Sequence, residues 1–494
     1  MKKPFYSVPC PFAAGIRQRA QLLVALMGLA PAAFAQSSFS FPSVYPTGGG
    51  SPLGVALGDV NGDTRLDVVT ANQSSDNVSV FLGAGGTMGS LAPALTYSPG
   101  GLRPTGVALG DVNGDGRPDI ITGNQSSNTV GVMLNSATSP GSFLPATSYP
   151  SGGTAPNIVA LGDLNGDGRT DIAVGNTGSS AVGVLLGSAA TPGTFLPAAT
   201  YPSGSSSPVG IAIGDVNADG KPDLVLGHNS GNTVSVLLNS AAVPGTFGSP
   251  AVYNSGGTGT VGISLGDVNG DGRVDIVAAN ATSSSVAVLL GQSGTLGTFG
   301  PATVYNSGGI GPNFALLSDV NGDGRPDIVT ANNSSNGAGS VGVLTGLAAP
   351  AGTFAPATVF SSGGNGPIGI ALGDINGDGR RDVVTTNYIS GTVAVLLNTY
   401  TPLATALAQS TAEVFVYPNP AHGTFEVQVP GVADAQAVQA ELLNTLGQVV
   451  YRQPAFLPPS GTHVIIDAAG LAPGVYTLRL QAGSTAMSRR VVLH

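Results

Sequence analysis

Short apolar runs alternate with polar turns along most of the chain, and the alternation recurs with a fixed period. From Phe39 to Asn398, runs of Val, Ile and Leu with small residues are separated by stretches rich in Gly, Asn, Ser and Pro. Such runs favour β-strands, and no stretch shows helical periodicity. A period of about 50 residues is typical of blades or solenoid coils, so the pattern predicts an all-β repeat array.

One unit of this array divides into four expected strands. Gly106–Leu109 leads into a polar loop, Ile120–Gly123 leaves it, and Val130–Leu134 follows after a polar turn. Phe143–Tyr149 ends the unit before a Ser-Gly-Gly sequence. Four-stranded sheets around a central axis form a β-propeller, and seven units lie within the usual range of this architecture.

The two ends of the array complement each other. Phe39–Gly49 matches the last strand of a unit but comes first, and the seventh unit, Ile370–Asn398, lacks its fourth strand. The leading strand can therefore pair with Val393–Leu397 and close a ring, whereas a linear solenoid caps both of its ends. We predict a seven-bladed β-propeller over residues 39–398, with the N-terminal strand completing the last blade.

An acidic nonapeptide occurs seven times in the array. Its fullest form, Asp111–Asp119, reads Asp-Val-Asn-Gly-Asp-Gly-Arg-Pro-Asp, and its first Asp recurs every 52 residues, with a final step of 55. Asp, Asn, Asp and Asp stand at positions one, three, five and nine of every copy. These candidate metal ligands are Asp59, Asn61, Asp63, Asp67, Asp111, Asn113, Asp115, Asp119, Asp163, Asn165, Asp167, Asp171, Asp215, Asn217, Asp219, Asp223, Asp267, Asn269, Asp271, Asp275, Asp319, Asn321, Asp323, Asp327, Asp374, Asn376, Asp378 and Asp382. The backbone carbonyls at position seven belong to Arg65, Arg117, Arg169, Lys221, Arg273, Arg325 and Arg380.

Calcium is the cation that this pattern predicts. Ca2+ takes about six to eight oxygen ligands, which alternate residues of a tight loop can supply, and the lack of Glu at position twelve excludes an EF-hand. Asp, Asn and Gly also form ordinary turns, but a turn does not need three carboxylates, which repel one another without a cation. The loops hold 21 of the 27 acidic residues of the chain. We therefore expect up to seven calcium ions.

Two loops depart from the pattern. Thr64 replaces Gly at position six of the first copy, and Ala218 replaces Gly at position four of the fourth copy. A non-Gly residue forced to positive φ costs about 1 kcal/mol, so we predict that these two sites bind calcium more weakly.

Aromatic residues also recur at the repeat period. An exposed ring of aromatics could stack on sugars, but periodic aromatics are more often packed between blades, which is the interpretation we favour. The residues are Tyr45, Tyr97, Tyr149, Tyr201, Tyr253, Tyr305 and Phe360, together with Phe143, Phe195, Phe247 and Phe299.

The array contains few groups that could act in catalysis. Between residues 39 and 398 there is no Glu, Cys or Trp, and Asp76 is the only Asp outside the loops. The one His in this range, His228, is expected in a turn and facing solvent. A calcium loop is first a structural site, so a polysaccharide-active enzyme is disfavoured and we predict no enzymatic activity.

The first 35 residues have the features of a secretory signal peptide. The apolar stretch Leu22–Ala35 is too short for a membrane span of about 20 residues, and it ends in an Ala-Phe-Ala cleavage site. Cleavage would remove Cys10, the only cysteine, so no disulfide is expected. The basic region before the apolar stretch contains Lys2, Lys3, Arg17 and Arg19.

Without these residues the chain is strongly acidic. It has 13 Lys and Arg against 27 Asp and Glu, a net charge of −14 that seven divalent cations would neutralise. This balance offers no basic surface for nucleic acid or an anionic membrane, so neither is an expected partner.

The array resembles the FG-GAP or VCBS-type repeats, a family that includes the calcium-loop blades of integrin α subunits. The shared pattern is Gly-Asp-Val-Asn-Gly-Asp-Gly-Arg-Pro-Asp-Ile followed by a Val-x-Val-Leu-Leu strand. The resemblance implies that each loop joins the first two strands of a blade and holds calcium on the lower face of the ring. It also implies an adhesion or ligand-binding scaffold.

A second domain is expected at residues 413–494, after a linker at residues 399–412. It contains a Tyr-Pro-Asn-Pro sequence at Tyr417–Pro420, a Gly-Val-Tyr-x-Leu-x-Leu strand at Gly474–Leu480, and Arg489-Arg490 near the end. Alternating apolar residues with Pro and Gly turns predict a small Ig-like β-sandwich. The segment resembles the type A C-terminal sorting domain of the type IX secretion system, which implies that machinery as a partner. The alternative is an ordinary Ig-like appendage.

Two non-enzymatic functions remain open. The first is a binding or adhesion module that contacts a protein through its variable turns, and the second is a lectin-type propeller that binds glycans. Both would be monomeric and either secreted or held at the outer-membrane surface. The sequence does not specify the ligand.

Overall fold

The computed structural model describes residues 38–84, 89–334, 337–400, 415–429, 436–444, 448–457, 462–482 and 485–494. The expected signal peptide and residues 401–412 of the expected linker lie outside these ranges, so both stay predictions, as do the domain boundaries. Every regular element in the described ranges is a β-strand, which confirms the all-β class. No helix that could cross a membrane occurs among the described residues.

Seven four-stranded antiparallel sheets, which we call blades one to seven, follow one another through the described part of residues 43–396. Each of the first six blades uses four consecutive strands. Blades one to three contain β2 (Pro52–Gly58), β3 (Asp67–Asn72), β4 (Asn77–Phe81), β5 (Leu95–Tyr97), β6 (Pro104–Gly110), β7 (Asp119–Asn124), β8 (Thr129–Met133), β9 (Thr147–Pro150), β10 (Pro156–Gly162), β11 (Asp171–Asn176), β12 (Ala181–Leu185) and β13 (Ala199–Pro202). Blades four to seven contain β14 (Pro208–Gly214), β15 (Asp223–His228), β16 (Thr233–Leu237), β17 (Ala251–Asn254), β18 (Thr260–Gly266), β19 (Asp275–Asn280), β20 (Ser285–Leu289), β21 (Thr303–Asn306), β22 (Pro312–Ser318), β23 (Asp327–Asn332), β24 (Ala338–Leu344), β25 (Thr358–Asn365), β26 (Pro367–Gly373), β27 (Asp382–Asn387), β28 (Thr392–Leu396) and β1 (Ser43–Pro46).

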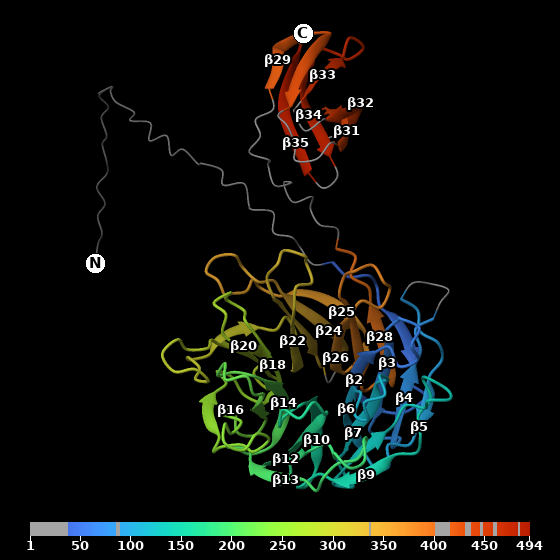
Figure 1. The fold of residues 1–494 in the computed structure, drawn as a ribbon, viewed down its shortest axis with the longest axis vertical. Coiled ribbons are helices and arrows are strands. Elements are labelled where there is room, and N and C mark those ends of the chain that lie inside the picture. The colour runs from blue at the N-terminus through green and yellow to red at the C-terminus, as the bar shows by residue number, and fades with distance from the viewer. Residues whose placement is uncertain are drawn as a thin grey trace, which may run out of the picture. The chain divides into compact units, whose positions relative to one another are not determined.

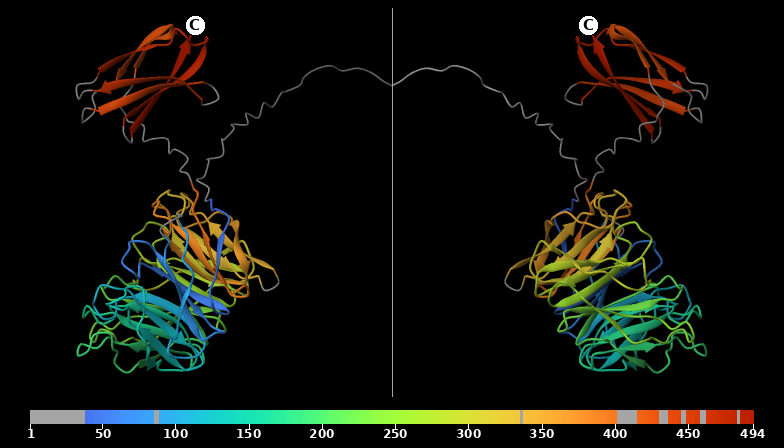
Figure 2. Two further views of the ribbon diagram at one scale, coloured as in Figure 1. Left: turned by 90° about the vertical axis from the view of Figure 1, so that its right-hand side faces the viewer. Right: turned by 90° about the vertical axis from the view of Figure 1, so that its left-hand side faces the viewer.

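The blades form a ring around a central axis. Their first strands, β2, β6, β10, β14, β18, β22 and β26, surround the axis, and each contacts the first strand of the next blade, with β26 contacting β2 (Figure 1). Figure 2 shows the ring from two opposite sides. This arrangement is that of a β-propeller.

The core of the ring lies between neighbouring blades. The second strand of each blade is completely buried, as in β7, because both of its faces are covered by adjacent blades. Each of the seven apolar clusters of the ring therefore combines residues of two blades; one joins Ile121 and Val130 of blade two to Val159 and Ile172 of blade three.

The predicted closure of the ring is observed in blade seven. Strand β1 pairs antiparallel with β28, from Ser43 opposite Val395 to Pro46 opposite Thr392, and the strand order is β1-β28-β27-β26. A further bridge joins Phe39 to Asn398. Both ends of the propeller segment are thus held in one sheet.

The fourth strand is shorter than predicted. In blade two it spans β9 alone, and Phe143 instead forms an isolated bridge with Asn135. Pro145 lies between Phe143 and the strand, and a proline has no N–H to donate to a ladder. The second strand begins earlier than predicted, at Asp119, the last residue of the loop.

Seven strands occur in the described part of the C-terminal domain. One group, β29-β30-β33, and a second group, β32-β31-β34-β35, meet where Ala421 of β29 pairs in parallel with Leu493 of β35. Phe425, Leu442 and Leu478 are among the residues of its core. The strands are β29 (Phe415–His422), β30 (Thr424–Val429), β31 (Gln436–Leu443), β32 (Val449–Leu457), β33 (Thr462–Asp467), β34 (Gly474–Ala482) and β35 (Thr485–Leu493).

The Tyr-Pro-Asn-Pro sequence of this domain has a visible structural role. The Asn419 side-chain amide donates to the Arg490 carbonyl at 2.9 Å, and its oxygen accepts from the Val492 N–H at 2.9 Å. Asn419 therefore fixes β29 against the last strand. The more specific prediction of an Ig-like sandwich stays a prediction.

Candidate metal centres

The seven nonapeptides all connect the first strand of a blade to its second. In blade two the loop begins after Gly110, the last residue of β6, and ends at Asp119, the first residue of β7. Because every copy occupies the same connection, the seven loops lie at the same end of their blades, as the resemblance to FG-GAP repeats implied.

The first Asp organises the backbone of each loop. In blade two, Asp111 Oδ1 accepts hydrogen bonds from the N–H groups of Gly114 at 2.7 Å and Asp115 at 3.1 Å, and Oδ2 accepts from Gly116 at 2.8 Å. A short acidic side chain that bonds its own following backbone favours this kind of tight turn. The bond to the residue at position six occurs in all seven loops.

Positions three, five and seven form a local network. Asn113 Oδ1 accepts from the Asp115 N–H at 2.9 Å, and Asp115 Oδ1 accepts from the Arg117 N–H at 3.0 Å. The Arg117 guanidinium forms an ion pair with the other Asp115 oxygen. Five further loops contain the same ion pair, whereas Lys221 of blade four forms none within the described residues.

The Asp at position nine is buried and ties the loop to the blade. Asp119 is fully buried; its Oδ2 accepts from the Val112 N–H at 3.0 Å, and its Oδ1 accepts from the Asn135 N–H at 2.7 Å. Asn135 lies just after the third strand. The equivalent pair of bonds occurs in all seven blades.

Burial changes the acidity of these carboxyls. It raises the pKa of Asp119, Asp223 and Asp382 to about 6 and that of Asp327 to about 7. Two backbone N–H donors oppose the rise, and the negative charges at positions five and one add to it. The three Asp residues of a loop are therefore close enough to repel one another, which is an environment that favours a cation.

The loop backbone confirms the need for Gly at positions four and six. Gly114 and Gly116 have φ values of 77° and 82°, and Thr64 and Ala218 are held at 70° and 58°. L-residues other than Gly rarely adopt this region, so the two replacements are strained. Their effect on metal affinity stays a prediction.

The donors suit a hard cation, although their side chains are engaged in other bonds. The loops offer carboxylate, amide and carbonyl oxygens, the ligand types of calcium. Within the described residues, however, no three Asp, Glu, His or Cys side chains gather into a metal-binding cluster. The carboxylates instead accept backbone N–H groups and, at position five, the arginine.

The prediction of a solvent-facing His228 is wrong. His228 is the last residue of β15 and is fully buried, with Nε2 2.8 Å from Ser235 Oγ. Ser235 in turn donates to the Ser203 carbonyl at 2.6 Å. Burial lowers the pKa of His228 to about 4.

The sequence did contain a signal for this position. In the other six blades the equivalent residue is a buried Asn, and the side chain of Asn124, for example, donates to the Pro99 carbonyl at 3.1 Å. The repeat period places His228 in this set, which would have indicated burial. The six residues are Asn72, Asn124, Asn176, Asn280, Asn332 and Asn387.

The recurring aromatics pack between blades, as predicted. Tyr97 of blade one meets Phe143 of blade two edge to face, with ring centroids 5.4 Å apart. The same contact joins each following pair of blades through blade six, and Phe39 packs against Phe360 at the closure. Phe39 and Phe354 are additional members of the set, and Tyr45 packs against the cluster that contains Leu91 between blades seven and one.

Among solved structures the chain shows a likeness of fold. A structure of BBS1N in complex with ARL6DN is 12% identical, covers 74% of this chain and 98% of its own, and has a TM-score of 0.51. A protein from Lactobacillus plantarum (14% identity, 84% and 100% coverage) and a putative 6-phosphogluconolactonase from Bacteroides uniformis (10% identity, 84% and 100% coverage) each have a TM-score of 0.43. No curated protein matches the chain.

Two sequence families match the chain directly. The FG-GAP-like repeat matches residues 59–122, 111–174, 163–226, 215–278 and 319–385, and the secretion system C-terminal sorting domain matches residues 415–494. The sorting domain marks the chain for type IX secretion to the cell surface or the extracellular space. The protein therefore belongs to the FG-GAP-like repeat family and is a secreted protein with a β-propeller-like fold and a C-terminal sorting domain.

Proposed function

We propose that the protein is a calcium-binding, non-enzymatic module that binds or adheres to an extracellular partner after type IX secretion. One observation carries the calcium part of this proposal. Seven loops place the same three carboxylates at the same connection, and one of them is fully buried in each blade.

The side chains at positions one, three, five and nine, with the position-seven carbonyl, would hold each ion. Bound calcium would supply positive charge and connect oxygens from both ends of the loop. The Asp at position nine already bonds the start of the loop and the residue after the third strand. A calcium ion that fixes the Asp at position nine would therefore also fix the start of the loop and the residue after the third strand. We assign the loops a structural role rather than a catalytic one.

The contact surface proposed for the partner lies at the opposite end of the blades. The turns there join second to third strands and fourth strands to the next blade, and their residues vary from copy to copy. Leu102, Ile310 and Ile389 are exposed apolar residues in these turns. Variable turns with apolar side chains suit a protein partner.

The packing of the aromatics favours a protein-binding module over a lectin. A lectin-type propeller needs repeated exposed rings for sugar stacking, whereas these rings pack edge to face between blades. The buried position of His228 and its lowered pKa also support a non-enzymatic role, because the group is neither accessible nor protonated near neutral pH.

Elemental analysis of the purified protein tests the calcium proposal. We expect several calcium ions per chain and a fall in melting temperature when EGTA removes them, because a cation that binds only the folded state stabilises it by mass action. Readdition of calcium, but not magnesium at the same concentration, should restore the melting temperature. Absence of bound calcium together with a chelator-insensitive melting temperature would show that the loops are not calcium sites.

A further inference from the structure

The seven blades repeat so closely that residues breaking the repeat can be identified by position. The residue before the loop is Gly in six blades and Ser318 in blade six. Two residues earlier, Ala occurs in five blades, with Ser264 in blade five and Leu316 in blade six. Position eight of the loop is uncharged in six copies and is Arg381 in the seventh.

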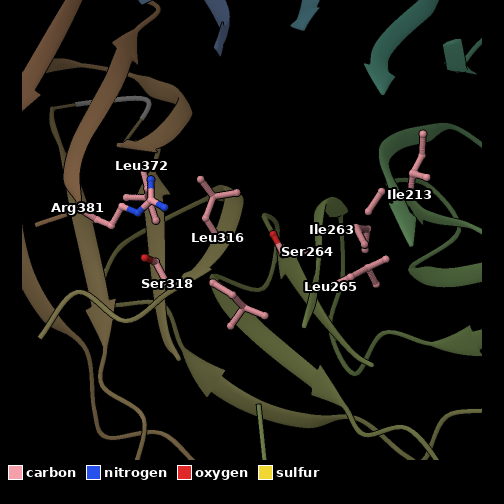
Figure 3. A pocket seen from close by; sticks show the side chains of 10 residues that line it. Ile213, Ile263, Ser264, Leu265, Leu316, Ser318, Leu372 and Arg381 are labelled. Carbon is pink, nitrogen blue, oxygen red and sulfur yellow. The ribbon is translucent and has the colours of Figure 1, made fainter. Parts of the chain in front are cut away.

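These four departures meet in one cavity near the axis of the ring. The cavity has a volume of about 470 Å³ and is lined by the first strands of blades four to seven together with Arg381 (Figure 3). Ser264, Leu316, Ser318 and Arg381 all belong to its lining. These residues come from three separate repeats. Together they make the side chains on one side of the ring different from those on the other sides.

Most of the residues that line the cavity are apolar. Ile213, Ile263, Leu265, Leu316 and Leu372 face it from four successive blades (Figure 3). A volume of this size with apolar walls and a few polar groups is typical of a small-molecule site.

Arg381 provides a positive charge that is not paired within the described residues. Neighbouring Arg380 is paired with Asp378 at 2.6 Å, but the Arg381 guanidinium is exposed and has no hydrogen bond or ion pair among the described residues. The Ser318 hydroxyl, also in the lining, is likewise free of partners in the described part of the chain. Ser264 differs, since its hydroxyl donates to the Ala315 carbonyl at 2.6 Å.

The surroundings restrict the charge of a ligand. Ser318 and Arg381 also line an adjoining cavity of about 590 Å³, whose lining includes Asp319, Asp378 and Arg380. These acidic groups disfavour phosphate or a polyanion, because the two carboxylates balance the charges of Arg380 and Arg381 and leave no net positive charge for a multiply charged ligand. A single negative charge on an apolar body matches both the arginine and the walls.

Phe314 narrows the central axis of the ring on one side of the cavity. It stands where blades one, two, four, five and seven have Gly, and its ring packs against Gly262 of blade five. It lines a separate cavity of about 90 Å³ farther along the same strands. The ring therefore narrows the axis there, and a ligand would enter from the loop end.

We propose that the cavity at Arg381 binds a small organic monocarboxylate with an apolar body, aliphatic or aromatic. The guanidinium and the Ser318 hydroxyl bind the carboxylate, and the body lies against Leu316, Leu372 and the isoleucines. Arg381 belongs to the seventh loop and Ser318 precedes the sixth, but neither residue is one of the predicted calcium ligands, so we expect binding both with and without calcium.

Calorimetric titration of the full-length secreted protein with phenylbutyrate and hexanoate tests the proposal. We expect one saturable site per chain for at least one of them, in calcium and in EGTA. Phenylbutanol has the same body as phenylbutyrate without its charge, and it should bind more weakly. Inorganic phosphate should not compete.

Two variants locate the site. Arg381→Thr, which installs the residue of blade three, should weaken binding by about tenfold or more, because a charge-assisted hydrogen bond is lost. Arg103→Asn removes the same charge at the other end of a first strand, where a φ of 55° suits Asn, and should leave affinity within about twofold. Melting temperatures of both variants establish that they fold.

Three outcomes overturn the proposal. These are no binding of either carboxylate, unchanged affinity in Arg381→Thr, and equal affinity for phenylbutanol and phenylbutyrate. A calcium-free preparation that still binds phenylbutyrate supports this site even if the calcium proposal fails.

Discussion

Blades two and seven have the same four-stranded sheet, but they assemble it from different chain segments. Blade two uses the consecutive strands β6 to β9, whereas blade seven takes three strands from the end of the ring and β1 from its beginning. The aromatic contact of blade two, Tyr97 with Phe143, is matched at the closure by Phe360 with Phe39. The comparison shows that a blade requires four strands with the right side chains and does not require a continuous segment.

Removal of the leading strand is the most severe way to break this equivalence. A chain that begins at Ser51 loses β1 and the buried Phe39, and leaves one edge of β28 without its partner. We expect unfolding free energy to fall by about 4 kcal/mol or more, given about 1.5–3 kcal/mol for each large apolar side chain removed from the core. The exposed edge should also promote oligomers.

Urea unfolding and size-exclusion chromatography measure both effects. A chain that begins at Ser38 is the matched control and should behave like the full protein. If the chain from Ser51 is monomeric and equally stable, the contribution of β1 to the ring is refuted.

Blade four differs from blade two at a buried position and offers a second comparison. His228→Asn gives blade four the arrangement of blade one, where Asn72 Nδ2 donates to Ser79 Oγ at 2.6 Å. The pKa of His228 in the folded protein, about 4, lies below its unfolded value of about 6.5, so the unfolded chain takes up the proton first as pH falls. Its stability contribution is full above pH 6.5 and is lost towards pH 4.

The loss from His228 should reach at most about 3 kcal/mol near pH 4. It is measured as the difference in unfolding free energy between the two proteins from pH 7 to pH 4, since the acidic loops titrate in both. His228→Asn should therefore gain stability relative to the parent as pH falls. Parallel curves for the two proteins would contradict the assignment of a buried neutral histidine.

The loops of blades one and two allow the same Asp substitution to be compared in a strained and an unstrained loop. Asp115→Ala should lower unfolding free energy in calcium by about 2 kcal/mol, in the range of a lost buried or metal-linked interaction. Asp63→Ala should cost less, because Thr64 already strains the first loop at a φ of 70°. In EGTA the difference between the two variants should shrink. A larger loss for Asp63→Ala would mean that the strained loop is the tighter site.

The smallest expected change in stability comes from exchanging Gly and Ala at position four of a loop. Gly114→Ala reproduces in blade two the Ala218 of blade four, and a Cβ there meets no atom within 4 Å, so only backbone strain is added. We expect a cost of about 1 kcal/mol, and a similar gain from Ala218→Gly. Thermal unfolding of the two variants, with opposite shifts, measures it. Shifts of the same sign would show that the replacement in blade four is compensated elsewhere.

Much of this architecture follows from the repeat itself. Phe39–Gly49 could be assigned to blade seven because it matches the fourth strand of other units, and Asp119 could be identified as a candidate ligand from its fixed position. The register of a short strand interrupted by Pro145 could not be read from apolar residues alone. The burial of His228 follows from the repeat register, which aligns it with six buried Asn residues, and not from the residue type alone.

The cavity at Arg381 could not be predicted for a different reason. Ser264, Leu316 and Arg381 lie in three successive blades, and the curvature of the array around its axis places them around one space. In a linear solenoid the same departures from the repeat would be scattered along a surface. The ion pairs of the arginines at position seven differ in this respect. Each joins an Arg to an Asp two residues away, so it depends only on the local geometry of one loop.

The pairing of β1 with β28 has a mechanical consequence. A pull transmitted from the C-terminal side of the propeller arrives first at β28, which lies between β1 and β27 rather than at an edge. Thr399 also donates its N–H to the Ser38 carbonyl at 2.8 Å, just beyond the ladder. To extract β28, tension must shear two hydrogen-bonded ladders at once. The point where the chain leaves the ring is therefore held by two ladders and not by one.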